Sequence, residues 1–471
     1  MLVTGSWLQY KFRWIVVDIR SDSGRPCDES QINDRDRLVK YIWGKHASET
    51  PSVPLHYPLL AVLVIAASIA PTTWFLSRDL GYLIVAGVLC LIIAYGVLFT
   101  SVRLTIDPAF LVLLGGYWLG LVAHYYYFPH SELLQYILVT PIAVFGTVVI
   151  LPQFVEGRRQ TFTMGLTVLS VIVALIGVWI LWQPGTIDSE LPNSIGGEVM
   201  GLYAIRSTSV FHNPNTYGFF MMVGCLAALY TVVVRGGLVW IAALGICLLG
   251  LFMSEGDAAL IGLGVGSIVV LAGRSQWLSF FGIGAGVVGL YGLIQVGHVP
   301  EVMETTLMSR VDRWVLSLER LALDPLWGIG FVDPGPEING ARGPHNSYIH
   351  VLLNTGVIAG SLYLGALAYA VGSGIRRRWT PWSGFILGTG AGTFAYMGFE
   401  SLFLGGLTTS SIVLGLFIGL MLLTDPSSEE RDSEPATAKY ALVTSRAGRA
   451  FDSFRSSSDN RQAPPQPKTE D

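Results

Sequence analysis

Residues 163–183 read TMGLTVLSVIVALIGVWILWQ, a run of apolar residues without a charged side chain. A run of this kind is long enough to cross the hydrocarbon core of a bilayer as a helix, which takes about 20 residues. Similar runs recur along the chain, near 58–76, 80–100, 108–128, 132–152, 163–183, 215–234, 237–253, 258–273, 277–297, 347–371, 380–399 and 402–423. The pattern predicts an all-α polytopic membrane protein with about twelve transmembrane helices.

The composition supports this class of protein. Of 471 residues, 52% are hydrophobic and only 13% are charged, against roughly 25% charged in soluble domains. A net charge of −4 leaves no basic surplus for covering phosphate backbones, so no nucleic-acid partner is expected. The four cysteines form no CxxC or Cys/His spacing, so neither a zinc site nor a disulfide framework is indicated, and no other metal or cofactor is predicted.

The arginines predict the orientation, because short cytoplasmic loops collect Lys and Arg. If residues 1–56 lie inside, the short outer loops contain only Arg78. The short inner loops then contain Arg103, Arg158, Arg159, Arg235, Arg274, Arg376, Arg377 and Arg378. This asymmetry predicts a multi-pass protein of the cell (plasma) membrane with both termini in the cytoplasm. The long connections 184–214 and 298–346 would lie outside.

Three regions are predicted along the chain. Residues 1–56 form a polar cytoplasmic segment without the features of a cleavable signal peptide, so the first membrane run would act as the insertion signal. Residues 57–424 form the transmembrane domain. Residues 425–471 are rich in Ser, Pro and charged residues and are expected to be a disordered cytoplasmic tail.

The first outer connection contains a single basic residue, Arg206. It precedes Asn213 and Pro214, a pair typical of a helix start. A lone arginine near the outer membrane face is suited to bind a phosphate through both arms of its guanidinium group. The alternative is a surface arginine or one paired with an acid.

The second outer connection contains a predicted amphipathic helix between Pro300 and Pro325. At 100° per residue, one stripe of this helix is apolar: Leu307, Val311, Trp314, Val315, Leu318 and Leu321. One flank carries Arg310, Arg313 and Arg320, and the opposite flank carries Asp312 and Glu319. Either the arginine flank faces a polyanionic substrate, or the helix lies at the membrane interface with its arginines extended to the headgroups.

His345 lies where this connection meets the next membrane helix. A neutral imidazole there can accept a proton, whereas the alternative role is to hydrogen-bond the helix start. His350 falls about 140° around the helix from His345, so no metal pair is expected and His350 is predicted to be a hydrogen-bonded helix residue. Glu400 is an ionisable group at the outer membrane boundary, separated from the last membrane run only by Ser401. It is a functional candidate that would orient His345 or pair with an arginine, unless it is simply a hydrated interfacial glutamate.

The sequence resembles the O-antigen ligase and O-antigen polymerase family. The resemblance rests on Arg310-x-x-x-Trp314, on Pro325-Leu-Trp-Gly-Ile-Gly330, and on His345-Asn346 followed by nine residues and Gly356. Asn213-Pro-Asn215 fits as well. The likeness covers roughly residues 200–370 by motif and 57–424 by hydropathy.

The resemblance implies a GT-C-like helical fold and a metal-independent glycosyltransferase. Such enzymes transfer a glycan from a polyprenyl-diphosphate carrier in the membrane lipid to a hydroxyl of a glycan, glycolipid or other acceptor. They work on the outer face of the membrane, in surface polysaccharide biosynthesis. The family's histidine falls on His345 and its signature arginine on Arg310. Arg310 is assigned to the diphosphate together with Arg206 and Arg313, the last two by their loop position rather than by a matched motif. Asn346 and Glu400 are assigned supporting roles.

Two departures from the family pattern leave lipid ligase and chain polymerase both open. Gly356 is followed by Val, Ile, Ala359 and Gly360, and Ser254-Glu255-Gly256 stands where members often carry Ser-Arg-Gly. The rival prediction is a twelve-helix transporter or flippase of a lipid-linked glycan. Scarce charge inside the helices and the concentration of distinctive residues in outer loops favour the enzyme.

Overall fold

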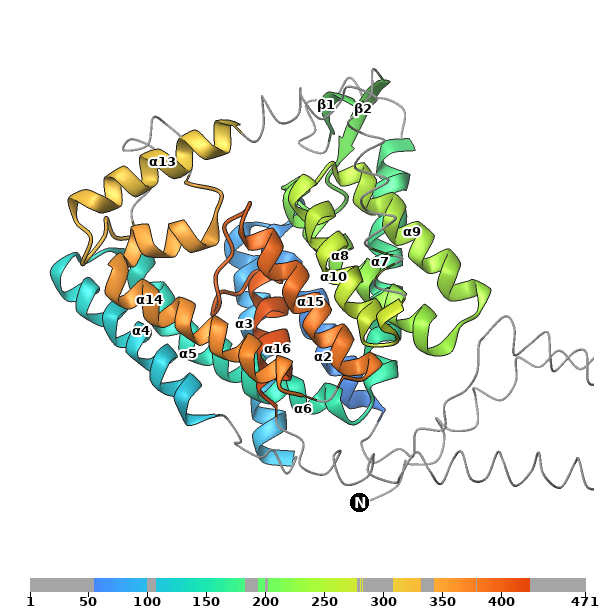
Figure 1. Cartoon of the computed structure of the whole chain (residues 1–471), viewed down its shortest axis with the longest axis horizontal. Helices are drawn as coiled ribbons and strands as arrows, with labels where there is room; N and C mark the ends of the chain where they lie inside the picture. Colours follow the sequence, from blue (N-terminus) through green and yellow to red (C-terminus); the bar gives the residue numbers. More distant parts are fainter. Residues whose placement is uncertain are drawn as a thin grey trace, which may run out of the picture.

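The computed structural model describes residues 55–99, 107–182, 194–199, 202–277, 280, 282, 308–331, 343–377 and 379–423. Of 194–199 and 202–206 it describes the backbone only. Over these ranges the chain is a bundle of helices with one small hairpin (Figure 1). The predicted cytoplasmic segment 1–56, except for its last two residues, and the predicted tail 425–471 lie outside the described residues.

The helices follow the predicted apolar runs. They are α2 (His56–Ala67), η2 (Ala70–Thr72), α3 (Arg78–Phe99), α4 (Pro108–Tyr127), α5 (Ser131–Val144), the π-helix η3 (Phe145–Ile150), α6 (Leu151–Glu156), α7 (Arg159–Trp182), α8 (Pro214–Arg235), α9 (Leu238–Ser254), α10 (Asp257–Ala272), α13 (Met308–Leu323), α14 (Ser347–Ile375), α15 (Pro381–Met397) and α16 (Thr409–Leu422). Each predicted run corresponds to one or more of these elements except 277–297, most of which lies outside the described residues: 58–76 overlaps α2 and η2, and 132–152 overlaps α5, η3 and the start of α6.

Six helices in the described ranges are long and apolar enough to cross a membrane. They are α3, α4, the continuous Ser131–Glu156, α7, α8 and α14. Shorter apolar helices, including α9, α10 and α16, accompany them. The polytopic helical class is confirmed, and the count of twelve spans stays a prediction.

Helix α14 is broken at Gly356, whose φ of 71° and ψ of 175° are not helical. Its first part lies across one end of the bundle below α13, and the rest runs down beside α4 (Figure 1). The segment 325–330 fills the break through backbone hydrogen bonds from Ile329 N to Leu353 O (2.8 Å), Gly330 N to Asn354 O (3.1 Å) and Val357 N to Pro325 O (2.8 Å). A Cβ on Gly356 would lie 2.0 Å from Leu326 O, so only glycine fits there.

Glycines bring α10 and α15 into backbone contact. A Cβ added to Gly262 would lie 2.6 Å from the carbonyl oxygen of Gly392, and one on Gly266 would lie 2.7 Å from that of Gly388. Small residues at a membrane helix interface permit this close approach. The contact fixes α15, and therefore the start of the 398–408 connection that leaves its C-terminal end.

The connection between the last two predicted membrane runs, 380–399 and 402–423, is longer in the structure than the sequence predicted. Helix α15 ends at Met397 and α16 begins at Thr409, so residues 398–408, rather than Glu400 and Ser401 alone, connect them. Leu402 and Leu404 continue the apolar pattern but are buried in the protein. Their backbone amides donate to Ser347 Oγ (2.8 Å) and Tyr363 Oη (2.9 Å) respectively, which satisfies non-helical backbone inside the protein.

The connection 184–214, expected to be a loop, contains a two-stranded antiparallel hairpin. Its strands are β1 (Ser194–Val199) and β2 (Leu202–Ser207), and Arg206 pairs with Ile195. The hairpin and α13 lie at the same end of the bundle (Figure 1). At this end α8, α14 and α16 begin and α15 ends, so the predicted polar constellations are gathered there.

Candidate active site

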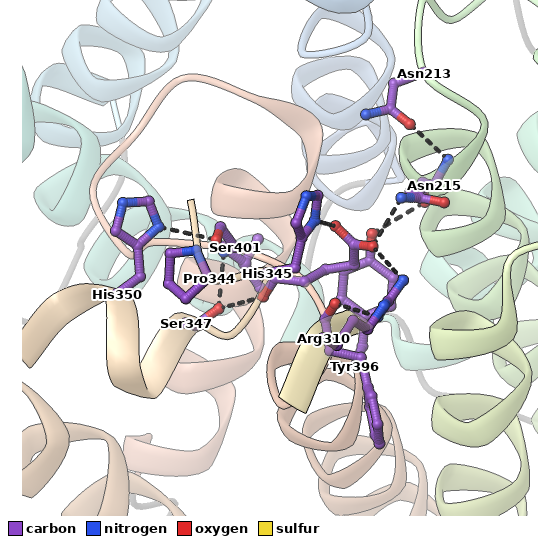
Figure 2. Close-up of polar contacts among 12 residues, drawn as sticks. Asn213, Asn215, Arg310, Pro344, His345, Ser347, His350, Tyr396 and Ser401 are labelled. Atoms are coloured by element: carbon purple, nitrogen blue, oxygen red, sulfur yellow. Dashed lines mark hydrogen bonds and ion pairs between the residues drawn. The ribbon is translucent and has the colours of Figure 1, made fainter. Parts of the chain in front are cut away.

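The carboxylate of Glu400 is the centre of a buried polar cluster. Its Oε1 accepts hydrogen bonds from Asn215 Nδ2 (2.7 Å) and Arg310 Nη2 (3.2 Å). Its Oε2 lies 3.1 Å from Nδ1 of His345. Figure 2 shows the three labelled side chains pointing to this one carboxylate from separate elements. The structure therefore shows both contacts that were considered for Glu400, one with the histidine and one with an arginine.

The contact with Glu400 defines the tautomer of His345. An ionised carboxylate only accepts hydrogen bonds, so Nδ1 must carry the proton in the 3.1 Å contact. In the neutral imidazole Nε2 then holds the lone pair. The His345 side chain is 33% exposed, so it remains accessible beside a mostly buried partner. It can accept a proton from a molecule that enters from this end of the bundle.

The start of α14 holds the loop that carries Glu400. Ser347 Oγ donates to the carbonyl oxygen of Glu400 (2.7 Å), and Asn346 Nδ2 donates to that of Gly398 (3.0 Å). Asn346 is also the N-cap of α14, because its Oδ1 accepts from the amides of Tyr348 (3.0 Å) and Ile349 (3.1 Å). The helix start and the loop are thus one hydrogen-bonded unit around the histidine.

His345 adopts a left-handed backbone conformation, with φ of 48°. This conformation costs an L-residue about 1–2 kcal/mol. The cap at Asn346 and the positive φ of Gly343 define the backbone on both sides. Conformations of this kind concentrate at functional sites, where the surrounding structure maintains them.

Helix α13 is attached to both sides of the cluster. Arg310 Nη1 donates to the carbonyl oxygen of Phe399 while Nη2 contacts Glu400. Trp314, one turn later on the same face, donates from Nε1 to the carbonyl oxygen of Pro344 (2.9 Å). The Arg-x-x-x-Trp spacing therefore joins α13 to the residue before His345 and to the residue before Glu400.

Asn215 and Tyr396 belong to the cluster although sequence reasoning did not select them. Asn213 caps α8 as predicted, with its Oδ1 accepting from the amide of Asn215 (2.8 Å). The side chain of Asn215 extends to Glu400, and its carbonyl oxygen accepts from Tyr396 Oη (3.1 Å). Capping needs only Asn213, the first asparagine of Asn-Pro-Asn. The second asparagine, Asn215, was therefore the residue that the sequence could have indicated as a candidate for the site.

The remaining predicted residues lie outside this set of contacts. Arg313 is half-buried on α13, and within the described part of the chain it has no hydrogen bond or ion pair. Arg206 lies in β2, but its side chain is outside the described residues. His350 is hydrogen-bonded, as predicted, with Nδ1 2.9 Å from Ser401 Oγ.

Within the described ranges, no group of three or more His, Cys, Asp or Glu side chains could hold a metal ion.

Comparison with known proteins gives a match that covers part of the candidate site. Residues 241–364 match the family model described as O-antigen ligase. The match contains Arg310, His345 and the break at Gly356, whereas Asn215 and Glu400 lie outside it. A search of curated proteins finds none that matches the chain. Within a polytopic helical chain, this match to O-antigen ligase over residues 241–364 supports a role of the membrane-glycosyltransferase type in surface polysaccharide biosynthesis.

Proposed function

We propose that the protein transfers a glycan from a polyprenyl-diphosphate carrier to an acceptor hydroxyl on the outer face of the cell membrane. The observation that carries the proposal is the His345–Glu400–Arg310 cluster at one end of a membrane helix bundle. The O-antigen ligase match supports the reaction class. The acceptor is the hydroxyl of a glycan, a glycolipid or another molecule.

In the proposed reaction, His345 acts as the general base. Nδ1 donates to Glu400, so Nε2 is free to remove the proton of the acceptor hydroxyl. A bond forms between the acceptor oxygen and the anomeric carbon as the bond from that carbon to the diphosphate breaks, and its electron pair leaves with the diphosphate. Glu400 stabilises the imidazolium that forms, and a base so placed contributes about 10²–10⁴ in rate.

Arginines would neutralise the departing diphosphate, so the proposed step uses no metal. Arg313 is the best placed, because it lies about 60° around α13 from Arg310 and has no partner in the described part of the chain. Arg310 already contacts Glu400 and the Phe399 carbonyl, so its first role is to position the carboxylate. Arg206 would contribute from the hairpin.

The outer location is supported by the distribution of arginines. Arg159 contacts Trp382 at the start of α15, and Arg235 ends α8, so both lie at the end of the bundle away from the cluster. Arg274 follows α10 and Arg376 follows α14 at that same end. The positive-inside rule then assigns that end, with both termini, to the cytoplasm.

The deciding experiment uses the purified full-length protein in liposomes with a polyprenyl-diphosphate-linked glycan and a hydroxyl acceptor. The expected result is release of polyprenyl diphosphate together with an equal amount of glycosylated acceptor. Movement of the intact donor between leaflets, without bond formation, would instead identify a flippase and refute the proposal.

A further inference from the structure

Against the described part of the chain, helix α13 buries only part of its apolar surface. Ser317 and Leu321 are its buried residues. Val315 is 49% exposed and Leu318 is 47% exposed. The two exposed side chains lie on the other edge of the same apolar stripe, together with Val311. We refer to Val311, Val315 and Leu318 as the free edge of α13.

The C-terminal end of α13 continues into the surface of two membrane-spanning helices. Leu326 is 56% exposed, and the Trp327 ring lies 5.4 Å from the ring of Tyr127, the last residue of α4. Pro325 is hydrogen-bonded to Val357, where the lower part of α14 begins with its own exposed apolar side chains. Exposed apolar side chains on a membrane-spanning helix face lipid, and Trp and Tyr collect at the interface.

Acidic and basic side chains lie on different sides of α13, and the acidic ones are next to the free edge. At 100° per residue the free edge covers about 60° of the helix. The exposed acids Asp312 and Glu319 adjoin it, and the arginine flank lies roughly opposite. Acids beside the free edge would repel anionic headgroups. An attachment on this side must therefore come from apolar burial rather than from charge attraction.

We propose that α13 lies in the membrane interface and buries its free edge in the lipid of the outer leaflet, without a requirement for anionic lipid. The acids then face water, and the arginine flank faces the polar cluster. This placement holds Arg310 and Arg313 at the depth of the lipid headgroups. The lipid contact does not depend on the proposed reaction, and it is tested without an activity assay.

The test measures the surroundings of single spin labels on the full-length protein in phosphatidylcholine vesicles. The four natural cysteines are replaced by alanine, and labels are attached after Val315→Cys or Leu318→Cys. Asp312→Cys and Glu319→Cys, on the same helix, are the matched controls. The ratio of collision rates with oxygen, which concentrates in lipid, and with a polar nickel chelate, which stays in water, is expected to be several-fold higher at Val315 and Leu318 than at the controls.

Three outcomes would overturn the proposal. Equal ratios at all four positions would mean that the free edge is in water. Labels at Val315 and Leu318 that are shielded from both reagents would mean that protein covers the edge. A high ratio that appears only after anionic lipid is added would mean that charge, rather than apolar burial, attaches the helix.

Discussion

Glu400 is a nearly buried carboxylate with three donors, and each donor comes from a different part of the chain. Burying a charge is unfavourable unless it is paired and hydrogen-bonded. The cluster meets this condition only while Asn215, Arg310 and His345 all stay in place. Removing one member therefore changes the electrostatics of the others.

His345→Asn is expected to lower transfer by at least about 10²-fold, the usual contribution of a general base. Asparagine tolerates the left-handed backbone that His345 adopts, so the unfolding temperature should stay close to that of the wild type. The measurement is turnover with the lipid-linked donor, beside thermal unfolding. His56→Asn, at an exposed histidine in α2, is the matched control. Wild-type turnover in the His345 variant would remove this residue from the mechanism.

Glu400→Gln is expected to lower kcat and to change the pH dependence of kcat/KM, because the amide cannot hold His345 in the same tautomer and stabilise its charge. The variant also leaves Arg310 without its counter-charge in a mostly buried site, at a cost of about 1–3 kcal/mol. The pH profile is the informative measurement. A lower unfolding temperature with an unmoved pH profile would show that Glu400 is only structural.

Arg310 and Arg313 are expected to respond differently to substitution. Arg310→Lys should lose both stability and activity, because one ammonium group cannot contact Glu400 and the Phe399 carbonyl in the way the guanidinium fork does. Arg313→Ala should raise the KM for the lipid-linked donor and leave the unfolding temperature unchanged. Full activity of the Arg310 variant, or a stability loss in the Arg313 variant, would contradict this division of roles.

At the level of elements, the break in α14 is the feature most sensitive to a single methyl group. Gly356→Ala places a Cβ 2.0 Å from the Leu326 carbonyl oxygen at a residue with positive φ. The expected loss of stability is about 3 kcal/mol or more, since left-handed strain adds to the overlap. Gly372→Ala, in the same helix with nothing within 4 Å, should be neutral or slightly stabilising. Equal unfolding temperatures for the Gly356→Ala and Gly372→Ala variants would show that the backbone at Gly356 does not lie this close to the Leu326 carbonyl oxygen.

The sequence predicted the elements far better than it predicted their contacts. Hydropathy and helical period predicted the membrane runs and the amphipathic helix, because both depend on neighbours within a few turns. They did not predict the 398–408 connection, since Leu402 and Leu404 have the same hydropathy in lipid and in a protein interior. The pairing of His345 with Glu400, 55 positions apart, was one of two contacts considered for Glu400, but no local pattern could show that one carboxylate makes both of them.

For the whole molecule, topology is the prediction on which the proposed chemistry depends. In a chain whose natural cysteines are replaced, Ser189→Cys and Asn339→Cys should react with an impermeant thiol reagent on intact cells. Ser457→Cys should react only after the cells are opened. The reverse pattern would place His345 in the cytoplasm, where a donor in the outer leaflet does not reach it.

The stretch between His345 and the break in α14 also acts as a spacer of fixed length. The cap at Asn346 and the break at Gly356 are ten residues apart, which is about 15 Å at 1.5 Å per residue. Both ends are attached, one to the Glu400 loop and the other to the 325–330 segment. Inserting or deleting one residue here would turn the histidine end by about 100° relative to the break. A change in the length of this stretch would therefore misalign the imidazole and the carboxylate together.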